Sequence, residues 1–169
     1  MSLRNIPGLS CGPTAALWPF RLLAAVIALF AAVSMPNSPG FAQQPLEKLT
    51  VVTSSGRHVF RVEVMRKPED LARGLMFRRR LPANRGMLFD FGRVDPVAMW
   101  MRNTYISLDM VFIDNKGVVA NIAENTEPLS ELNIVSARPV LAVLEVIAGT
   151  AKRIGLKPGD RIIHPLFRR

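Results

Sequence analysis

Short apolar runs recur along the chain from Leu49 onward, and polar positions alternate with apolar ones at the spacing of β-strands. Residues 49–53 and 59–65 are rich in β-branched side chains, and the polar, glycine-containing segment 54–57 separates them. This composition predicts two strands joined as a hairpin. In the second run valines alternate with charged residues, so one face is expected in the core and the other in water.

The same pattern continues to the end of the chain. The most distinct later hairpin is expected where an Asp-Asn-Lys-Gly turn joins two apolar runs. Residues 140–147 are apolar at every position except Glu145, as in a strand buried on both faces. The expected strands after the first hairpin are 86–91, 97–101, 108–114, 118–123, 140–147 and 161–164.

Two short helices are expected between these strands. Pro68, followed by two acidic residues, is suited to the first turn of a helix, and residues 149–155 predict one or two further turns. Residues 124–139 have little periodicity and predict a long excursion. Many short strands with two brief helices indicate an α+β, mostly β domain. We expect a small, partly closed β-barrel of about seven or eight strands.

The first 42 residues have the pattern of a secretory signal peptide. Positive charge precedes an uncharged apolar run of 12 residues, Leu22–Val33, and small residues lead to a cleavage site after Ala42. A retained membrane anchor is the alternative, but the run is well short of the ~20 residues that span a bilayer as a helix. We therefore expect a signal peptide at 1–42, a lead segment at 43–48 and a single domain at 49–169, located in the periplasm or secreted.

Composition narrows the classes of function. Cys11 lies in the predicted signal, so the mature chain has no thiol for a disulfide, a nucleophile or a cysteine zinc site. Its net charge is about +7. Export, and the absence of aromatic residues within Arg78–Arg80, argue against a nucleic-acid partner. An anionic envelope surface, or simple solubility, is the better explanation, and no cofactor or metal is predicted.

The block Met99–Thr104 carries the most varied chemistry of the chain. If it is extended, Met99, Met101 and Asn103 point to one side, whereas Trp100, Arg102 and Thr104 point to the other. One side is then soft and apolar, and the other is aromatic and cationic.

Several blocks in fixed order make the chain recognisable. They are Ala72–Arg78, Gly86–Phe91, Met99–Thr104, Leu108–Asp114, Val143–Glu145, Gly149–Gly155 and Lys157–Asp160. Their order resembles that of the domain of unknown function 192 family, over nearly all of the mature chain. The resemblance implies a compact, mostly β domain, often exported in bacteria, with no established catalytic activity. Arg102 stands where relatives commonly have lysine, and Ser107 where they commonly have proline.

Six residues form the predicted ligand-binding set. An arginine fork matches carboxylate or phosphate, an indole stacks on a sugar or cation, and buried carboxylates need partners. The leading hypothesis is a non-enzymatic binding or interaction domain with a shallow pocket for a small polar or anionic ligand. The pocket is expected at Arg73, Trp100, Arg102, Asn103, Asp109 and Glu145.

Three alternatives remain open for these residues. The arginines could be structural and pair with Asp109 and Glu145 inside the fold. The same two carboxylates could instead act as acid and base in a hydrolytic enzyme, although no catalytic signature accompanies them. Six methionines of the mature chain, among them Met99 and Met101, could bind copper(I) in the periplasm, although methionine is more often core filler.

Overall fold

The structure, a computed structural model, describes residues 45–168, which belong to one compact unit. The predicted signal peptide at 1–42 lies outside the described residues. Within the described part, no helix is long and apolar enough to cross a membrane.

Nine strands and two α-helices are present among the described residues, and a short 3-10 helix follows the last strand. Their bounds are β1 (Glu47–Thr53), β2 (Gly56–Met65), α2 (Pro68–Arg73), β3 (Arg85–Asp95), β4 (Ala98–Met99), β5 (Leu108–Ile113), β6 (Val119–Ala123), β7 (Ile134–Val135), β8 (Val140–Ile147), α3 (Thr150–Ile154), β9 (Arg161–Ile163) and η1 (Pro165–Arg168).

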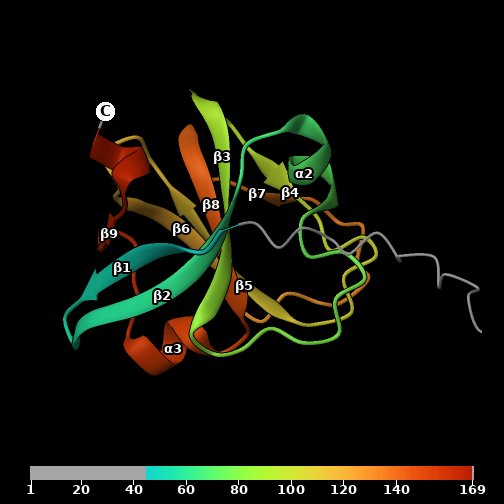
Figure 1. The fold of residues 1–169 in the computed structure, drawn as a ribbon, viewed down its shortest axis with the longest axis horizontal. Helices are drawn as coiled ribbons and strands as arrows, with labels where there is room; N and C mark the ends of the chain where they lie inside the picture. Colours follow the sequence, from blue (N-terminus) through green and yellow to red (C-terminus); the bar gives the residue numbers. More distant parts are fainter. Residues whose placement is uncertain (1–44, 169) are drawn as a thin grey trace, which may run out of the picture. The chain divides into compact units, whose positions relative to one another are not determined.

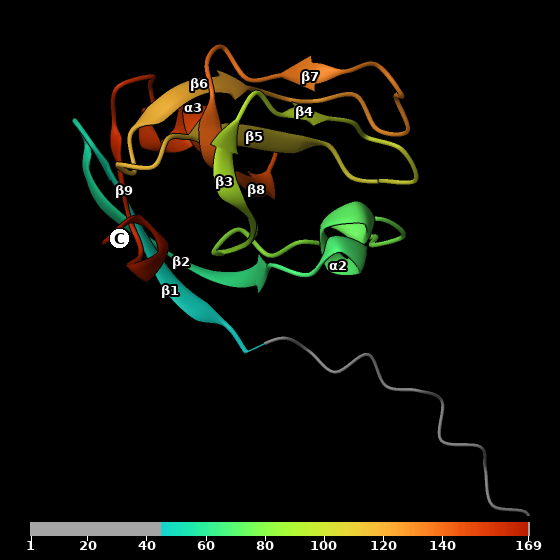
Figure 2. The same ribbon diagram turned by 90° about the horizontal axis from the view of Figure 1, so that it is seen from above.

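Seven of the strands form one sheet in the order β6-β5-β8-β3-β2-β1-β9. Neighbouring strands are antiparallel except β2 and β3, which are parallel. The sheet curls until its two edges approach (Figures 1 and 2), where a bridge joins Val118 to Arg161 and the Ile162 amide donates to the Gly117 carbonyl at 2.7 Å. The predicted partly closed, mostly β barrel is confirmed.

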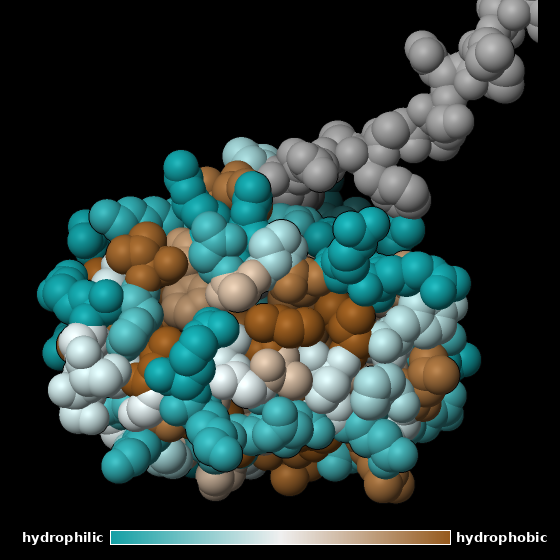
Figure 3. Space-filling model, turned by 90° about the horizontal axis from the view of Figure 1, so that it is seen from below, coloured by the Kyte–Doolittle hydropathy of each residue, from teal (hydrophilic) through white to brown (hydrophobic). Residues whose placement is uncertain are grey.

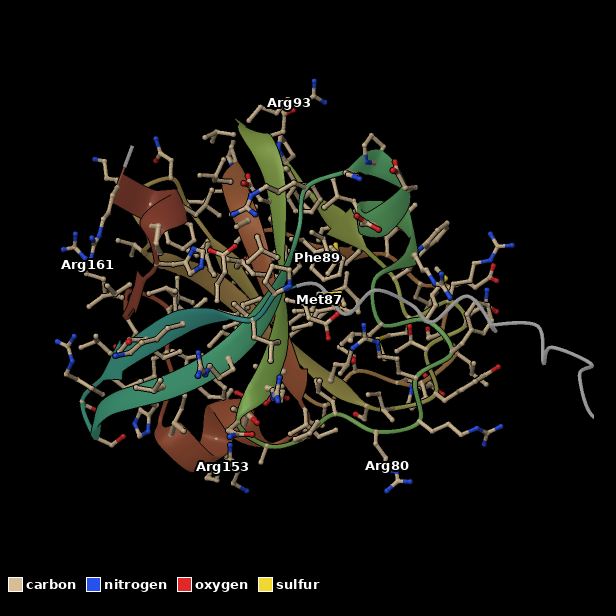
Figure 4. All side chains as sticks on the ribbon, in the orientation of Figure 1. Arg80, Met87, Phe89, Arg93, Arg153 and Arg161 are labelled. Carbon is tan, nitrogen blue, oxygen red and sulfur yellow. The ribbon has the colours of Figure 1, made fainter. Side chains whose placement is uncertain are left out.

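The curled sheet buries apolar side chains on both of its faces. The inner face holds one core, which includes Leu49, Phe60, Val62, Val111, Leu144 and Ile162. A second core lies on the outer face of β3, β5 and β8; Figure 4 labels two of its members, Met87 and Phe89, at the centre of the ribbon. Burial on both faces explains why β5 and β8 are apolar at nearly every position.

The eight predicted strands and two predicted helices agree with observed elements, with small shifts at their ends. The strand β7 lies within the expected excursion 124–139 and is not among the predicted strands; it pairs with β4 in a separate two-stranded sheet. The helix η1 is not predicted either. The expected strand 97–101 is regular only at Ala98–Met99, because the chain turns after Trp100. The first strand begins at Glu47, inside the expected lead segment. Gly74 ends α2 with φ +47°, and a Cβ there would lie 2.9 Å from the Phe89 ring, so glycine both ends the helix and admits this ring.

Candidate functional site

Residues 100–107 form an irregular segment held between two other loops, residues 74–84 and 124–133. The Phe77 amide donates to the Asn103 carbonyl at 2.8 Å, and the Leu129 amide donates to the Thr104 carbonyl at 3.1 Å. The three loops lie at the same end of the molecule, on the right of Figures 1 and 2. The block Met99–Thr104 is therefore hydrogen-bonded through its backbone to segments that precede and follow it by some 25 residues.

Large apolar side chains of these loops are exposed. The exposed fractions are 55% for Phe77, 44% for Trp100, 43% for Tyr105, 55% for Leu129 and 76% for Leu132. We call these five residues, together with Arg79 and Arg102, the loop surface. Figure 3 views the molecule from below Figure 1 and shows further apolar residues across the middle of that side, surrounded by hydrophilic ones. Exposed apolar groups gathered in one region mark interaction surfaces more often than single ones do.

Backbone strain is concentrated in the same three loops. Four non-glycine residues of the described chain have positive φ: Phe77 at 65°, Asn103 at 55°, Asn125 at 51° and Leu129 at 64°. Asparagine tolerates this conformation, whereas phenylalanine and leucine rarely adopt it. Phe77 and Leu129 therefore combine a strained backbone with an exposed apolar side chain, and such strain clusters at binding and catalytic sites.

The aromatic rings of the loop surface are paired with guanidinium groups. Arg102 lies over the Trp100 ring at 5.5 Å, and Arg79 lies over the Tyr105 ring at 5.4 Å. The Phe77 and Tyr105 rings meet edge to face at 6.3 Å. These contacts hold flat apolar groups and positive charge side by side at the solvent boundary.

The two sides predicted for the methionine block differ as expected at Met99–Arg102 but not at Thr104, which is expected beside Trp100 and Arg102 and is buried. Met101 is fully buried in the outer core and Met99 packs against it, whereas Trp100 and Arg102 are exposed. The expectation that Asn103 shares the methionine side is wrong, because its positive φ turns the chain and leaves the side chain exposed. The Met101 sulfur accepts a hydrogen bond from the Thr126 hydroxyl at 3.1 Å.

Three of the methionine thioethers lie fully buried in the outer core. Among residues 45–168 there is no group of three or more His, Cys, Asp or Glu side chains that could hold an ion. Met87, Met101 and Met110 are fully buried in the outer core. Their placement is that of core packing.

Asp109 is buried inside the barrel and is bonded to backbone amides. Its Oδ1 accepts from Asn125 at 2.9 Å and from Gly149 at 3.2 Å, and its Oδ2 accepts from the Ala151 amide at 2.8 Å. The amides of Gly149 and Ala151 belong to the start of α3, so the carboxylate caps this helix from β5. Asp109 therefore does not take the alternative in which an arginine pairs with it; three backbone N–H donors satisfy its carboxylate.

Glu145 lies on the opposite face of the sheet. Its cross-strand neighbours are Met87 and Met110, both in the outer core, and its own exposed fraction is 4%. Burial among these thioethers raises the pKa of Glu145 to about 8. No hydrogen bond or ion pair joins its carboxyl to another of the described residues.

The two carboxylates therefore do not form an acid–base pair. Asp109 is in register with Val146 of the inner core, whereas Glu145 is in register with Met110 of the outer core. Groups on opposite faces of one sheet cannot flank the same bond.

The predicted set of six residues separates into exposed and buried members. Arg73 lies in the last turn of α2 and is exposed, as are Trp100, Arg102 and Asn103. Arg102 pairs with Glu131 at 3.6 Å and with neither predicted acid. Three cavities of about 410, 280 and 270 Å³ lie elsewhere on the surface, and none of the six residues lines them.

Comparison with known proteins places this arrangement in a family. Residues 50–164 match the family model DUF192, described as an uncharacterized ACR, which covers both sheet faces and all three loops. The chain belongs to the DUF192 family. The family resemblance seen in the sequence is confirmed.

Two solved structures share the DUF192 fold of this chain. A crystal structure from Sinorhizobium meliloti 1021, provisionally named as a transcription regulator, is 46% identical; the match covers 73% of this chain and 97% of that one, with a TM-score of 0.71. A protein of unknown function from Novosphingobium aromaticivorans DSM 12444 is 41% identical, with 78% and 94% covered and a TM-score of 0.71. No curated protein matched.

Sequence reasoning missed part of the loop surface of this DUF192 chain. Neither Phe77 nor Leu129 is among the predicted site residues, although Leu129 lies within the expected excursion 124–139 and Phe77 directly precedes the basic run Arg78–Arg80. Their combination of positive φ and an exposed side chain is visible only in the structure.

Strain at Leu129 predicts a stabilising substitution. Asparagine adopts φ 64° more readily than leucine, so we expect Leu129→Asn to raise the free energy of unfolding by about 0.5–1 kcal/mol. Leu132→Asn is the control, since Leu132 is even more exposed but has no positive φ. Urea unfolding measures both, and a Leu129→Asn variant less stable than Leu132→Asn would contradict the strain argument.

Proposed function

We propose that this chain is an exported, non-enzymatic interaction domain whose loop surface binds a segment of another protein that carries acidic and apolar side chains. The observation that carries the proposal is the coincidence of strain and exposure at Phe77 and Leu129, next to the ring–guanidinium pairs of Trp100 and Tyr105. Tryptophan, tyrosine and arginine dominate the binding energy of protein interfaces.

The exposed rings of the loop surface favour a protein segment over the small ligand expected from sequence, because Phe77, Trp100 and Tyr105 lie at the solvent boundary with exposed fractions of 43–55%. Small ligands need concave sites that enclose most of their surface, whereas protein segments bind exposed aromatic anchors. An anionic partner remains part of the proposal, because Arg79 and Arg102 stand over the rings.

A displayed library of random peptides tests the proposal directly. We expect the wild-type protein to enrich peptides that combine acidic and apolar residues, and Trp100→Ala to weaken a selected peptide about 30-fold, as for a typical hot spot. Val94→Ala is the matched control, since Val94 is 43% exposed on β3 outside the three loops and should bind as wild type does.

Two results would overturn the proposal. One is enrichment of no peptide by the wild-type protein. The other is binding that Trp100→Ala and Val94→Ala weaken equally. Because Trp100 is 44% exposed, its truncation leaves the fold intact, which the thermal midpoint checks. A concentration-dependent dimer abolished by Trp100→Ala would identify a second copy of the chain as the partner and would replace the proposed one.

A further inference from the structure

A second surface, on the part of the sheet's outer face formed by β9, β1, β2 and the start of β3, is densely cationic. Five side chains project from this face of β9, β1, β2 and the start of β3: Lys48, Arg57, Arg61, Arg85 and Arg161. We call them the cationic face. Four of them are exposed and Arg85 is half-buried. In Figure 4, Arg161 projects from the left edge of the ribbon.

Strand register places three of these cations in one row. Lys48 of β1 pairs with Arg61 of β2, and Arg61 pairs with Arg85 of β3. Directly opposed side chains on neighbouring strands lie about 5 Å apart at Cβ, and like charges in this position destabilise a sheet. A second row joins Arg57, Val52 and Arg161. Folding thus assembles cations that repel one another.

The side chains of the cationic face have no acidic partner among the described residues, whereas five arginines elsewhere do. Ion pairs join five other arginines to carboxylates: Arg66, Arg78, Arg93, Arg102 and Arg138. No ion pair or hydrogen bond joins a side chain of the cationic face to another of residues 45–168. The acid beside this face, Glu63, is bound by both terminal nitrogens of Arg78 at 2.5 and 2.6 Å.

Hollows and small apolar side chains complete this surface. Val59, 51% exposed, lies between the two rows of cations. A cavity of about 410 Å³ is lined by Arg57, Val59 and Arg153, and one of about 270 Å³ by Arg80 and Arg85 among others. Figure 4 shows Arg153 and Arg80 pointing outward below the ribbon, so more positive charge rims these hollows.

We propose that the cationic face docks on a membrane surface of anionic phospholipid headgroups. Each lysine or arginine near such a surface contributes roughly fivefold to binding. Lipid phosphate groups would supply negative charge to the row Lys48, Arg61 and Arg85 and so relieve the repulsion between its cations. The two cavities beside the row would hold lipid headgroups. The face has valine, threonine and isoleucine between its cations. The aromatic residues that line its larger cavity are the buried Phe60 and the half-buried His58, so this cavity offers no exposed phenylalanine, tyrosine or tryptophan among the described residues for bases to stack on, which favours lipid over nucleic acid. This inference is independent of the loop surface.

Vesicle sedimentation of the full chain tests the docking. We expect binding to phosphatidylcholine vesicles to increase when they contain phosphatidylglycerol, and added salt to reduce that increase. The triple variant Lys48→Gln, Arg57→Gln, Arg61→Gln should lose about 100-fold in vesicle affinity. All proteins compared carry the same N-terminal segment, so its own membrane affinity cancels.

A matched variant separates the face from net charge. Lys67→Gln, Arg93→Gln, Arg138→Gln removes the same charge from exposed positions outside the face and should retain nearly wild-type binding. Equal losses in the two triple variants would overturn the proposal. So would tighter binding to duplex DNA that the first variant abolishes, or inorganic phosphate that displaces the protein from vesicles at unchanged ionic strength, which would indicate a free-phosphate site.

The experiment also distinguishes this inference from the proposed function. Trp100→Ala should bind vesicles as wild type does, and the first triple variant should bind the selected peptide with at most a modest change. Loss of vesicle binding in Trp100→Ala would overturn the assignment of lipid to the cationic face.

Discussion

Asp109→Asn should destabilise the protein strongly, with a loss of about 3 kcal/mol in the free energy of unfolding and about 10 °C in Tm. The carboxylate is fully buried and accepts three backbone N–H bonds. An amide nitrogen in place of Oδ2 would face the Ala151 N–H, so one acceptor is lost and two donors oppose each other. Calorimetry or urea unfolding measures the effect.

Asp114→Asn is the control for Asp109→Asn. Asp114 Oδ1 accepts from the amides of Lys116 and Val118, both at 2.9 Å, and Oδ2 pairs with Arg138 at 3.0 Å. Asparagine keeps the Oδ1 acceptor and loses only a part-exposed ion pair, which costs under about 1 kcal/mol. Equal stability of the two variants would show that the contacts of Asp109 with the start of α3 contribute little.

Glu145→Gln should stabilise the protein at neutral pH. Burial raises the pKa of Glu145 from its ordinary 4.5 to about 8, so between these values the unfolded chain releases a proton that the folded chain retains. The free energy of unfolding is therefore not reduced by ionisation of this carboxyl below pH 4.5. It falls progressively as pH rises from 4.5 to about 8, where the loss is complete. Glutamine resembles the protonated carboxyl but does not titrate, so the variant should be more stable by about 3 kcal/mol at pH 7.

The pH dependence gives this prediction its sharpest form. The free energies of unfolding of wild type and Glu145→Gln should be equal near pH 4. Above that pH the variant should become the more stable, by about 1.4 kcal/mol for each further pH unit up to pH 8. Titration of every other group cancels in the difference. Glu124→Gln, at an exposed position, should show no such growth. A difference independent of pH would mean that the Glu145 carboxyl is solvated in the folded state.

These two carboxylates illustrate how far sequence reasoning reaches in the site. Apolar neighbours flank Asp109 and Glu145 in the sequence and predict that both are buried, and both are. Their spatial neighbours could not be inferred. Asp109 and Val146 share a face, as do Glu145 and Met110, because of the register of β5 against β8. A shift of one residue in that register would exchange the faces.

The cationic face and the loop surface show the same division. Alternation along β2 predicts that Arg61 faces water, and it does. The neighbours Lys48 and Arg85 come from an antiparallel and a parallel partner, and no local pattern specifies both pairings. Likewise, no local pattern of the sequence shows that Phe77 and Leu129 adopt a positive φ.

By itself, the sequence determined the order and type of every element except β7 and η1, the partly closed barrel and the family, because hydrophobic periodicity and turn composition act over a few residues. Only the tertiary structure decided which side chains meet. It separated Asp109 from Glu145, paired Arg102 with Glu131, and gathered five cations on one face. Those outcomes depend on strand register, sheet curvature and the left-handed residues of the loops, which are set by packing between distant segments.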